Sequence, residues 1–195
     1  MSIAFDHLTK AGDFAVYAEY RLIRLERSGA MPPIVSIVGN SDAGKTTLLV
    51  KLIAELTARG YRVGTVKHDV HGFDIDHEGK DSWRHKQAGA HTVVISSPVK
   101  TAIVKDVETE ETLDGLASKY FENVDLILTE GYKKEDKPKI EVFRSRVHAA
   151  PLFGGDERLA ALVSDTRLDL GVPRFDLDDI TGLADFVEER FLSKR

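Results

Sequence analysis

The sequence predicts an α/β fold in which helices cover both faces of a mostly parallel central sheet. One observation is that short apolar segments alternate with helix-forming segments from residue 33 onward, which is typical of parallel sheets. The other is a complete G-x-x-x-x-G-K-[ST] phosphate-binding loop at residues 39–46, placed between an apolar segment and a helix-forming one. Together they indicate a P-loop NTPase domain over residues 33–195, preceded by a helical extension over residues 1–32.

The extension is predicted to contain a helix over residues 13–27, because its apolar side chains recur with helical spacing. Ser28-Gly29 and Pro32-Pro33 end this helix and lead into the first strand of the domain. We expect the helix to dock on the core, and an arm that binds a partner is the alternative.

Eight short and mostly apolar segments are predicted to be strands. In chain order they are residues 34–38, 61–67, 92–96, 101–104, 124–129, 139–143, 159–163 and 172–175. Helices are predicted at residues 45–58, 80–88, 110–120 and 178–192. Gly60 ends the first of these helices, and Asp178-Asp179 supply acidic residues suited to the start of the last.

The composition excludes several classes of function. The chain has 195 residues and a net charge of −5, so it lacks the basic excess that a general nucleic-acid partner requires. It has no cysteine, which excludes disulfides and thiolate metal sites. No apolar run approaches the roughly 20 residues of a membrane span, and residues 1–10 do not resemble a signal peptide. A cytoplasmic location without membrane contact is therefore expected.

The phosphate loop carries the first candidate binding residues. Its two glycines let backbone N–H groups turn toward phosphate oxygens, and the following helix presents its positive N-terminal end to the same anion. Lys45 is predicted to reach the β- and γ-phosphates, and the Thr46 hydroxyl is predicted to hold Mg²⁺. The loop residues expected to contact the nucleotide are Gly39, Asn40, Ser41, Asp42, Ala43, Gly44, Lys45 and Thr46.

Two carboxylates are candidates for the metal side of the nucleotide. Glu130 follows an apolar strand, so it is predicted to coordinate Mg²⁺ through water or to orient the attacking water. Gly131 would let the backbone approach the γ-phosphate closely. Asp69 follows the strand expected to neighbour the phosphate loop and is the second candidate for Mg²⁺. An ordinary charge at the end of a strand is the alternative for Glu130, and an acidic residue of a solvated loop is the alternative for Asp69.

Residues 68–77 contain three histidines and three aspartates, side chains that can ligate a transition metal. Their spacing matches no compact metal motif, and a solvated loop is the alternative. The lysine-rich segment 132–139 has a similar ambiguity: it can bind an anionic ligand or the acidic face of a partner, although charge runs are usually solvated loops.

The sequence contains no Asn-Lys-x-Asp element of the kind that specifies guanine in many GTPases. Asp165 follows strand 159–163, where base recognition is expected in chain order. Its carboxylate can accept hydrogen bonds from guanine N1–H and N2–H₂, which adenine cannot supply. Asp165 is therefore predicted to bind the nucleotide. The alternative is that it only ends the strand.

Several segments together resemble the family of molybdopterin-guanine dinucleotide biosynthesis protein B (MobB). They are GNSDAGKTTL, TVKHD, FDIDxxGKDSWRHxxAGA and TEGYKxxxxPKIEVxR, and they lie within residues 33–165. The run from Gly79 to His85 and the run from Glu130 to Arg144 are the most specific, because many unrelated proteins share the phosphate loop. Residues 1–32 are not part of the resemblance.

The resemblance implies a cytoplasmic homodimer that binds GTP and Mg²⁺ and hydrolyses GTP weakly. Such proteins assist MobA, the guanylyltransferase that joins GMP to molybdopterin, and molybdopterin or molybdoenzyme maturation factors are further implied partners. By matching position, Gly44, Lys45, Thr46 and Thr47 would hold phosphates and Mg²⁺, with Asp69 and Glu130 near the metal. Asp81, Arg84, His85 and Lys133 fall in the family-specific runs, where their polarity suggests contact with GTP, the pterin or a partner.

We therefore predict a GTP-binding accessory protein of molybdenum cofactor biosynthesis. Water would attack the γ-phosphate in line while Lys45 and Mg²⁺ neutralise charge, and slow turnover is expected because the sequence shows no obvious arginine finger. The alternative is a GTPase that inserts nickel or a similar metal through the loop at residues 68–77. A small-molecule kinase is a third class, but it would carry an Arg-rich lid that the sequence lacks after its core strands.

Overall fold

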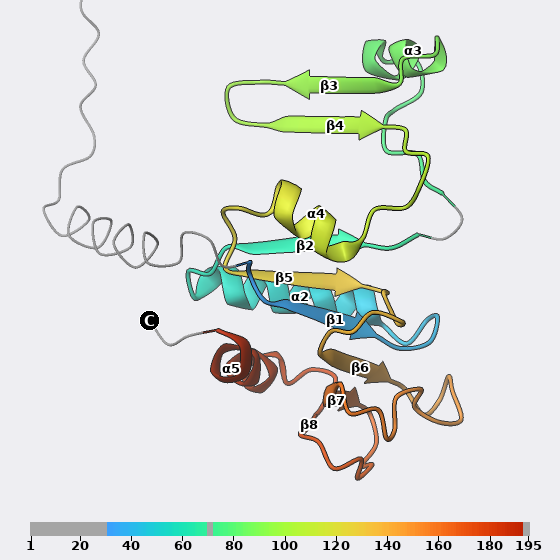
Figure 1. Ribbon diagram of the computed structural model, residues 1–195. Helices are drawn as coiled ribbons and strands as arrows, with labels where there is room; N and C mark the ends of the chain where they lie inside the picture. Colours follow the sequence, from blue (N-terminus) through green and yellow to red (C-terminus); the bar gives the residue numbers. More distant parts are fainter. Residues whose placement is uncertain (1–30, 70–71, 193–195) are drawn as a thin grey trace, which may run out of the picture. The chain divides into compact units, whose positions relative to one another are not determined.

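The computed structural model describes residues 31–69 and 72–192 (Figure 1). The chain divides into two units between Met31 and Pro32, and the fold below is that of the second. The extension predicted over residues 1–32, with its helix at residues 13–27, lies outside the described residues except for its last two positions.

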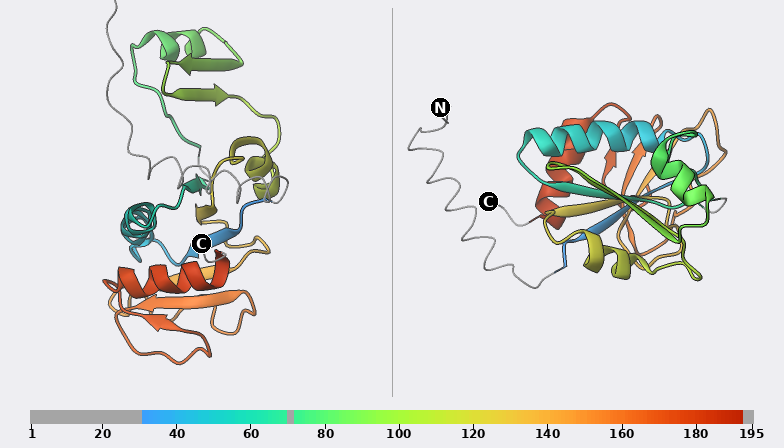
Figure 2. Two further views of the ribbon diagram at one scale, coloured as in Figure 1. Left: turned by 90° about the vertical axis from the view of Figure 1, so that its left-hand side faces the viewer. Right: turned by 90° about the horizontal axis from the view of Figure 1, so that it is seen from above.

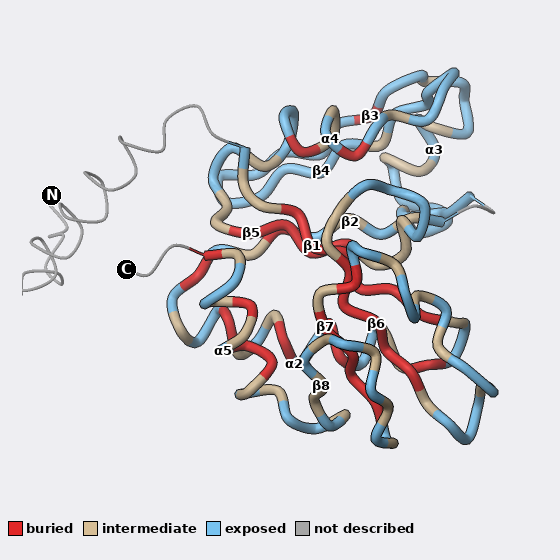
Figure 3. Tube along the Cα trace, turned by 60° about the horizontal axis from the view of Figure 1, so that its bottom comes forward, coloured by how far each residue is buried: buried red, intermediate tan, exposed pale blue. Residues whose placement is uncertain are grey.

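The core of the domain is a six-stranded sheet with the order β2-β5-β1-β6-β7-β8. Every neighbouring pair in it is parallel, which confirms the predicted sheet. The strands are β1 (Ile34–Val38), β2 (Val63–Lys67), β5 (Leu126–Glu130), β6 (Lys139–Phe143), β7 (Leu159–Ser164) and β8 (Arg174–Phe175). Figure 3 shows that buried residues are concentrated along β1, β5, β6 and β7.

Helices cover both faces of this sheet, as predicted (Figure 2). Helices α2 (Lys45–Ala58) and α5 (Ile180–Phe191) share the larger apolar core with one set of strand side chains, which includes Val35 and Val163. Helix α4 (Leu113–Tyr120) packs with Ile34 and Ile127 in a second cluster. Because successive side chains of a strand point to opposite faces, the two clusters lie on the two sides of the sheet.

Two predicted strands form a separate antiparallel hairpin instead of joining the parallel sheet. They are β3 (Thr92–Ser96) and β4 (Thr101–Lys105), and α3 (Asp81–Gln87) packs against β3. The physical reason is the length of their connection. Only residues 97–100 join them, whereas a parallel pair needs a crossover of a dozen or more residues.

The observed elements differ from the predicted ones mainly at their ends. Strand β2 begins at Val63 because the Tyr61 N–H is engaged by the last turn of α2, where it donates to Leu56 O at 3.0 Å. Strand β5 is displaced by two residues at its start and includes Glu130. Helices α4 and α5 begin after Thr112 and Asp179, whose side chains accept the N–H of the residue three positions on. Among the described residues no helix is long and apolar enough to span a membrane.

Candidate functional site

The phosphate loop joins the end of β1 to the start of α2 and has the backbone that its glycines predict. Gly39 and Gly44 have φ values of +139° and +96°, and Asp42 between them has a φ of +59°. A Cβ atom on Gly39 would lie 2.4 Å from the carbonyl oxygen of Val142 in β6. The loop therefore passes too close to β6 for any side chain at this position.

Lys45 bridges its own loop. Its Nζ donates to the carbonyl oxygen of Asn40 at 2.6 Å. Burial lowers the pKa of Lys45, and the nearby charge of Lys133 lowers it further, while Glu130 and Asp42 act in the opposite direction. The Lys133 ammonium therefore lies near enough to Lys45 for its charge to act on that lysine.

The two predicted magnesium residues, Thr46 and Glu130, are in direct contact although 84 positions separate them. Strand β5 lies beside β1 with Ile37 paired to Glu130, so the carboxylate reaches the first turn of α2. The Thr46 hydroxyl donates to Glu130 Oε1 at 2.6 Å. A hydroxyl and a carboxylate beside a phosphate loop are oxygen ligands that suit Mg²⁺. This ion is usually bound by one or two carboxylates together with the phosphates of the substrate.

The backbone turns sharply after Glu130. Gly131 and Tyr132 both have positive φ values, +97° and +51°, and a positive φ is uncommon for a residue with a side chain. Such strain persists only where the surroundings fix it, and it is concentrated at binding sites. The turn leads directly to Lys133, which is exposed.

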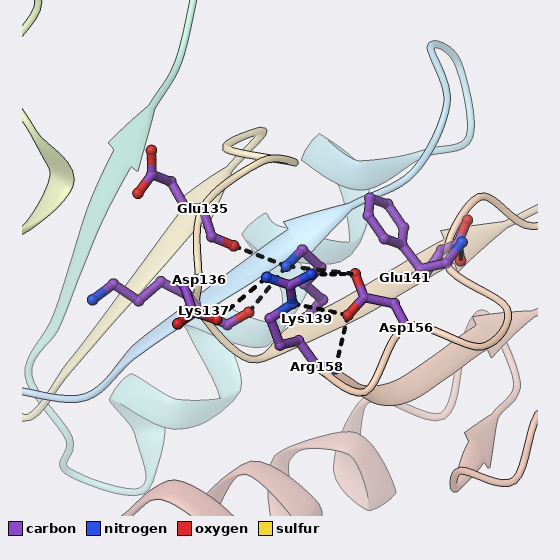
Figure 4. A network of polar contacts seen from close by, with 8 residues as sticks. Glu135, Asp136, Lys137, Lys139, Glu141, Asp156 and Arg158 are labelled. Carbon is purple, nitrogen blue, oxygen red and sulfur yellow. Dashed lines mark hydrogen bonds and ion pairs between the residues drawn. The ribbon is translucent and has the colours of Figure 1, made fainter.

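A buried lysine anchors the loop that carries Lys133 (Figure 4). Lys139, at the start of β6, is only 1% exposed, and its Nζ donates to the carbonyl oxygens of Glu135 at 2.9 Å and Lys137 at 3.3 Å. Asp156 Oδ2 lies 3.9 Å away and is itself bound by Arg158. These contacts hold the loop between β5 and β6 to the sheet, and burial lowers the pKa of Lys139.

Asp69 lies after β2, but β2 does not neighbour the phosphate-loop strand. Strand β5 lies between β2 and β1, so the adjacency assumed from the sequence is wrong and Asp69 is one strand further from the loop. His68 beside it contacts Glu110 Oε1 at 2.9 Å through Nε2, and its ring stacks at 4.8 Å on Tyr132. The metal role of Asp69 stays a prediction.

The remaining predicted site residues lie on other elements. Asp165 follows β7, where its Oδ1 accepts the N–H of Ser145 at 2.9 Å, and this bond lowers its pKa. Asp81, Arg84 and His85 lie on α3, which packs against the hairpin strand β3. The structure therefore places these three with the hairpin, and their ligand or partner contacts stay predictions.

The sequence did not identify the residues on the β6 side of the loop. His148 Nε2 lies 2.7 Å from the carbonyl oxygen of Ser41, and Arg144 is close enough to Gly44 that a Cβ there would meet its guanidinium at 2.9 Å. Lys51 and Asp178 join α2 to the segment before α5 at 2.7 Å. Sequence reasoning could have identified Arg144, because it directly follows β6 and ligands of parallel sheets bind beyond the carboxyl ends of strands.

The histidine- and aspartate-rich loop gives the metal-insertion alternative no support. Within residues 31–69 and 72–192, no three His, Asp or Glu side chains are grouped so that they could hold a metal ion. His71 lies outside the described residues.

The chain is similar to curated proteins of one family over most of its length. It is 40% identical over 157 residues to the molybdopterin-guanine dinucleotide biosynthesis adapter protein of Haemophilus influenzae, covering 80% of this chain and 88% of that protein. It is 42% identical over 163 residues to the Escherichia coli protein of the same name, covering 82% of this chain and 93% of that protein.

Solved structures agree with this similarity. The crystal structure of a molybdopterin-guanine biosynthesis protein B (MobB) has a TM-score of 0.62 and 34% identity over 80% of this chain and 98% of that one. Bacillus subtilis MobB has a TM-score of 0.68 and 26% identity over 83% of this chain and 99% of that one. The family model of molybdopterin guanine dinucleotide synthesis protein B matches residues 34–165, so the chain belongs to the MobB family.

Proposed function

We propose that this protein binds GTP with Mg²⁺ and acts as an adapter in molybdopterin guanine dinucleotide synthesis, in the cytoplasm. The observation that carries the nucleotide part is the contact of Thr46 with Glu130 at 2.6 Å, at the first turn of a phosphate-loop helix. The names of the relatives, which are biosynthesis adapter proteins, support the second part. The metal-insertion alternative, also a GTPase, shares the first support but lacks the second.

The nucleotide would lie along the phosphate loop with its γ-phosphate toward β5. Backbone N–H groups of residues 39–46 and the start of α2 would hold the phosphates, as helix N-termini do. Thr46 and Glu130 would hold Mg²⁺, which supplies charge neutralisation for the β- and γ-phosphates. Lys45 and Lys133 place two ammonium groups near the same anion.

Hydrolysis is expected to be slow in the isolated protein. The residues grouped around the γ-phosphate position are Lys45, Lys133 and Glu130, and Glu130 is the one that can orient water. An arginine finger raises turnover by about 10³–10⁵, whereas the charges that act on Lys45 come from Lys133, Glu130 and Asp42. The role proposed is therefore a nucleotide-dependent adapter rather than a fast enzyme.

The proposed partners are MobA, molybdopterin and a second copy of this chain. The hairpin supports the homodimer: Val94 and Ile103 are paired across β3 and β4 and are 57% and 51% exposed. An isolated two-stranded hairpin is marginally stable in water, so covering this apolar pair with a partner copy would stabilise it.

Direct titration tests the nucleotide proposal. Wild-type protein with Mg²⁺ is expected to bind GTP, and Lys45→Ala is expected to weaken binding at least tenfold because the phosphates lose a cation. Lys134→Ala, an exposed lysine next to Lys133, is the matched control and should bind like the wild type. Failure of the wild-type protein to bind any nucleoside triphosphate would refute the proposal.

Recovery of partners tests the adapter proposal. Tagged wild-type protein, incubated in an extract of cells that make molybdenum cofactor, is expected to recover MobA, and the amount should change when GTP and Mg²⁺ are added. The Lys45→Ala protein should lose the response to GTP. If MobA is not recovered under either condition, the protein is not an adapter for that enzyme.

A further inference from the structure

A pocket lies on the β6 side of the phosphate loop, away from Glu130. Its volume is about 210 Å³, below the roughly 300–1,000 Å³ of pockets that enclose whole drug-sized ligands, so it fits part of a ligand. Its lining comes from four regions of the chain: the phosphate loop, α2, the end of β6 with the residue that follows it, and the segment before α5. The residues are Gly44, Thr47, Leu48, Lys51, Val142, Arg144, Leu177 and Asp178.

The position of the pocket fixes which part of a nucleotide would enter it. Glu130 and Lys133 lie on the β5 side of the loop, the metal and γ-phosphate side. The pocket is on the opposite side and begins at Gly44 and Thr47. Lys51 lies four residues beyond Thr47, about 6 Å along α2. A polyphosphate held by the loop would therefore extend its nucleoside into the pocket.

Two residues of opposite charge in the lining of this pocket form an ion pair. Lys51 Nζ donates to Asp178 Oδ1 at 2.7 Å, and the two side chains are 46% and 88% exposed. This bond and the charge of Lys51 lower the pKa of Asp178, as does the charge of Arg144. Asp178 is therefore an acceptor of hydrogen bonds, and Lys51 beside it is only a donor.

This donor and acceptor match the edge of guanine and oppose that of adenine. Guanine presents the acceptor O6 next to the donors N1–H and N2–H₂, whereas adenine presents a donor, N6–H₂, next to the acceptor N1. A lysine on O6 and a carboxylate on N1–H and N2–H₂ would satisfy every group of the guanine edge. With adenine, the Lys51 ammonium would face the donor N6–H₂ and the Asp178 carboxylate would face the acceptor N1, so neither hydrogen bond would form.

We propose that Asp178 and Lys51 recognise the guanine base of the nucleotide held by the phosphate loop, with Arg144 lining the base pocket. The inference rests on the proposed GTP binding and adds its source of specificity. Arg144 belongs to the lining of this pocket, and its guanidinium would lie 2.9 Å from a Cβ on Gly44. Asp165, the reader predicted from the sequence, has an oxygen bonded to Ser145 N and does not line this pocket.

The test is a change of base preference in the variant Asp178→Asn. Xanthine carries a carbonyl oxygen where guanine carries the 2-amino group, and an asparagine amide can donate to that oxygen while still accepting N1–H. Titration of wild type and D178N with GTP and XTP, both with Mg²⁺, is expected to show GTP binding at least tenfold weaker and XTP binding at least tenfold tighter in the variant. A merely structural ion pair would not exchange one base for the other.

Two further variants make the outcome decisive. Lys51→Met should weaken GTP and XTP alike, because both bases carry O6. Asp165→Asn is the matched control and should keep the wild-type preference for GTP over XTP. The inference is overturned if D178N keeps that preference, or if D165N loses it instead, while the wild type binds GTP. If the wild type binds no GTP, the proposed function itself fails.

Discussion

At the residue scale, Gly39 shows how one position sets the path of the phosphate loop. Its φ is +139° and a Cβ there would meet Val142 O at 2.4 Å, so both the backbone and the space exclude a side chain. Gly155 has a comparable positive φ of +92° but open space around the position of a Cβ. A side chain at Gly155 would therefore strain only the backbone, whereas one at Gly39 would also collide with β6.

Gly39→Ala is expected to lower the free energy of unfolding more than Gly155→Ala does. Both pay the left-handed backbone penalty of about 1–2 kcal/mol, and only the first adds an overpacking cost of about 1–3 kcal/mol. Urea unfolding of both variants measures the difference. Equal losses would show that β6 can move away from the loop.

The neighbouring charges of Lys45 and Lys133 predict a pH dependence of GTP binding. Lys45 has a lowered pKa in the free protein, and bound phosphates would raise it, so binding takes up a proton between those two values. Affinity should therefore begin to fall, as the pH rises, below the ordinary lysine pKa of 10.5.

In Lys133→Met this fall is expected to begin at a higher pH, because one charge that lowers the pKa of Lys45 is gone. Affinity measured between pH 7 and pH 10 reports the shift, and Lys134→Met is the control that should leave the profile unchanged. An unchanged profile in the Lys133 variant would mean that its charge does not act on Lys45.

At the element scale, β3 and β4 show what a pattern of apolar segments leaves open. Both strands were predictable from their residues, but the short connection between them decided that they form a hairpin and do not join the parallel sheet. The loop of residues 97–100 is closed by Ser97, whose N–H donates to Lys100 O at 2.8 Å and whose Oγ accepts the Lys100 N–H at 3.0 Å. A closed turn of this length forces an antiparallel pair.

Val94→Arg is expected to weaken the proposed homodimer at least tenfold, because a charge would replace an apolar contact in the centre of the hairpin face. Val99→Arg is the control: Val99 lies in the turn of the same hairpin and is 92% exposed. Sedimentation equilibrium over a range of protein concentrations measures both. A wild-type protein that stays monomeric at about 100 μM would contradict the dimer.

At the scale of the whole molecule, the proposed nucleotide site joins segments that only folding brings together. Glu130 reaches Thr46 because β5 pairs with β1, and Asp178 reaches Lys51 because the segment before α5 lies beside α2. A nucleotide bound across these segments stabilises the folded state and not the unfolded chain, so the melting temperature should report binding.

GTP with Mg²⁺ at 100 times its Kd is expected to raise the melting temperature by about 5–10 °C. The linkage free energy at that concentration is about 2.7 kcal/mol, and 1 kcal/mol shifts Tm by about 2–4 °C in a chain of this size. Thr46→Ala, or removal of Mg²⁺ by EDTA, should reduce the shift. An equal shift in Lys45→Ala would place the nucleotide elsewhere.

The sequence by itself determined the parallel sheet, the phosphate loop and the place of Glu130 at the end of a strand, because these depend on local signals: apolar runs, glycines at fixed spacing and a carboxylate after an apolar run. It misplaced Asp69 by one strand, because strand order is set by pairings between distant segments. The Lys51–Asp178 pair and the action of the Lys133 charge on Lys45 came only from the tertiary structure. The physical reason is that charges act over a few ångströms in space, and spacing along the chain does not give that distance.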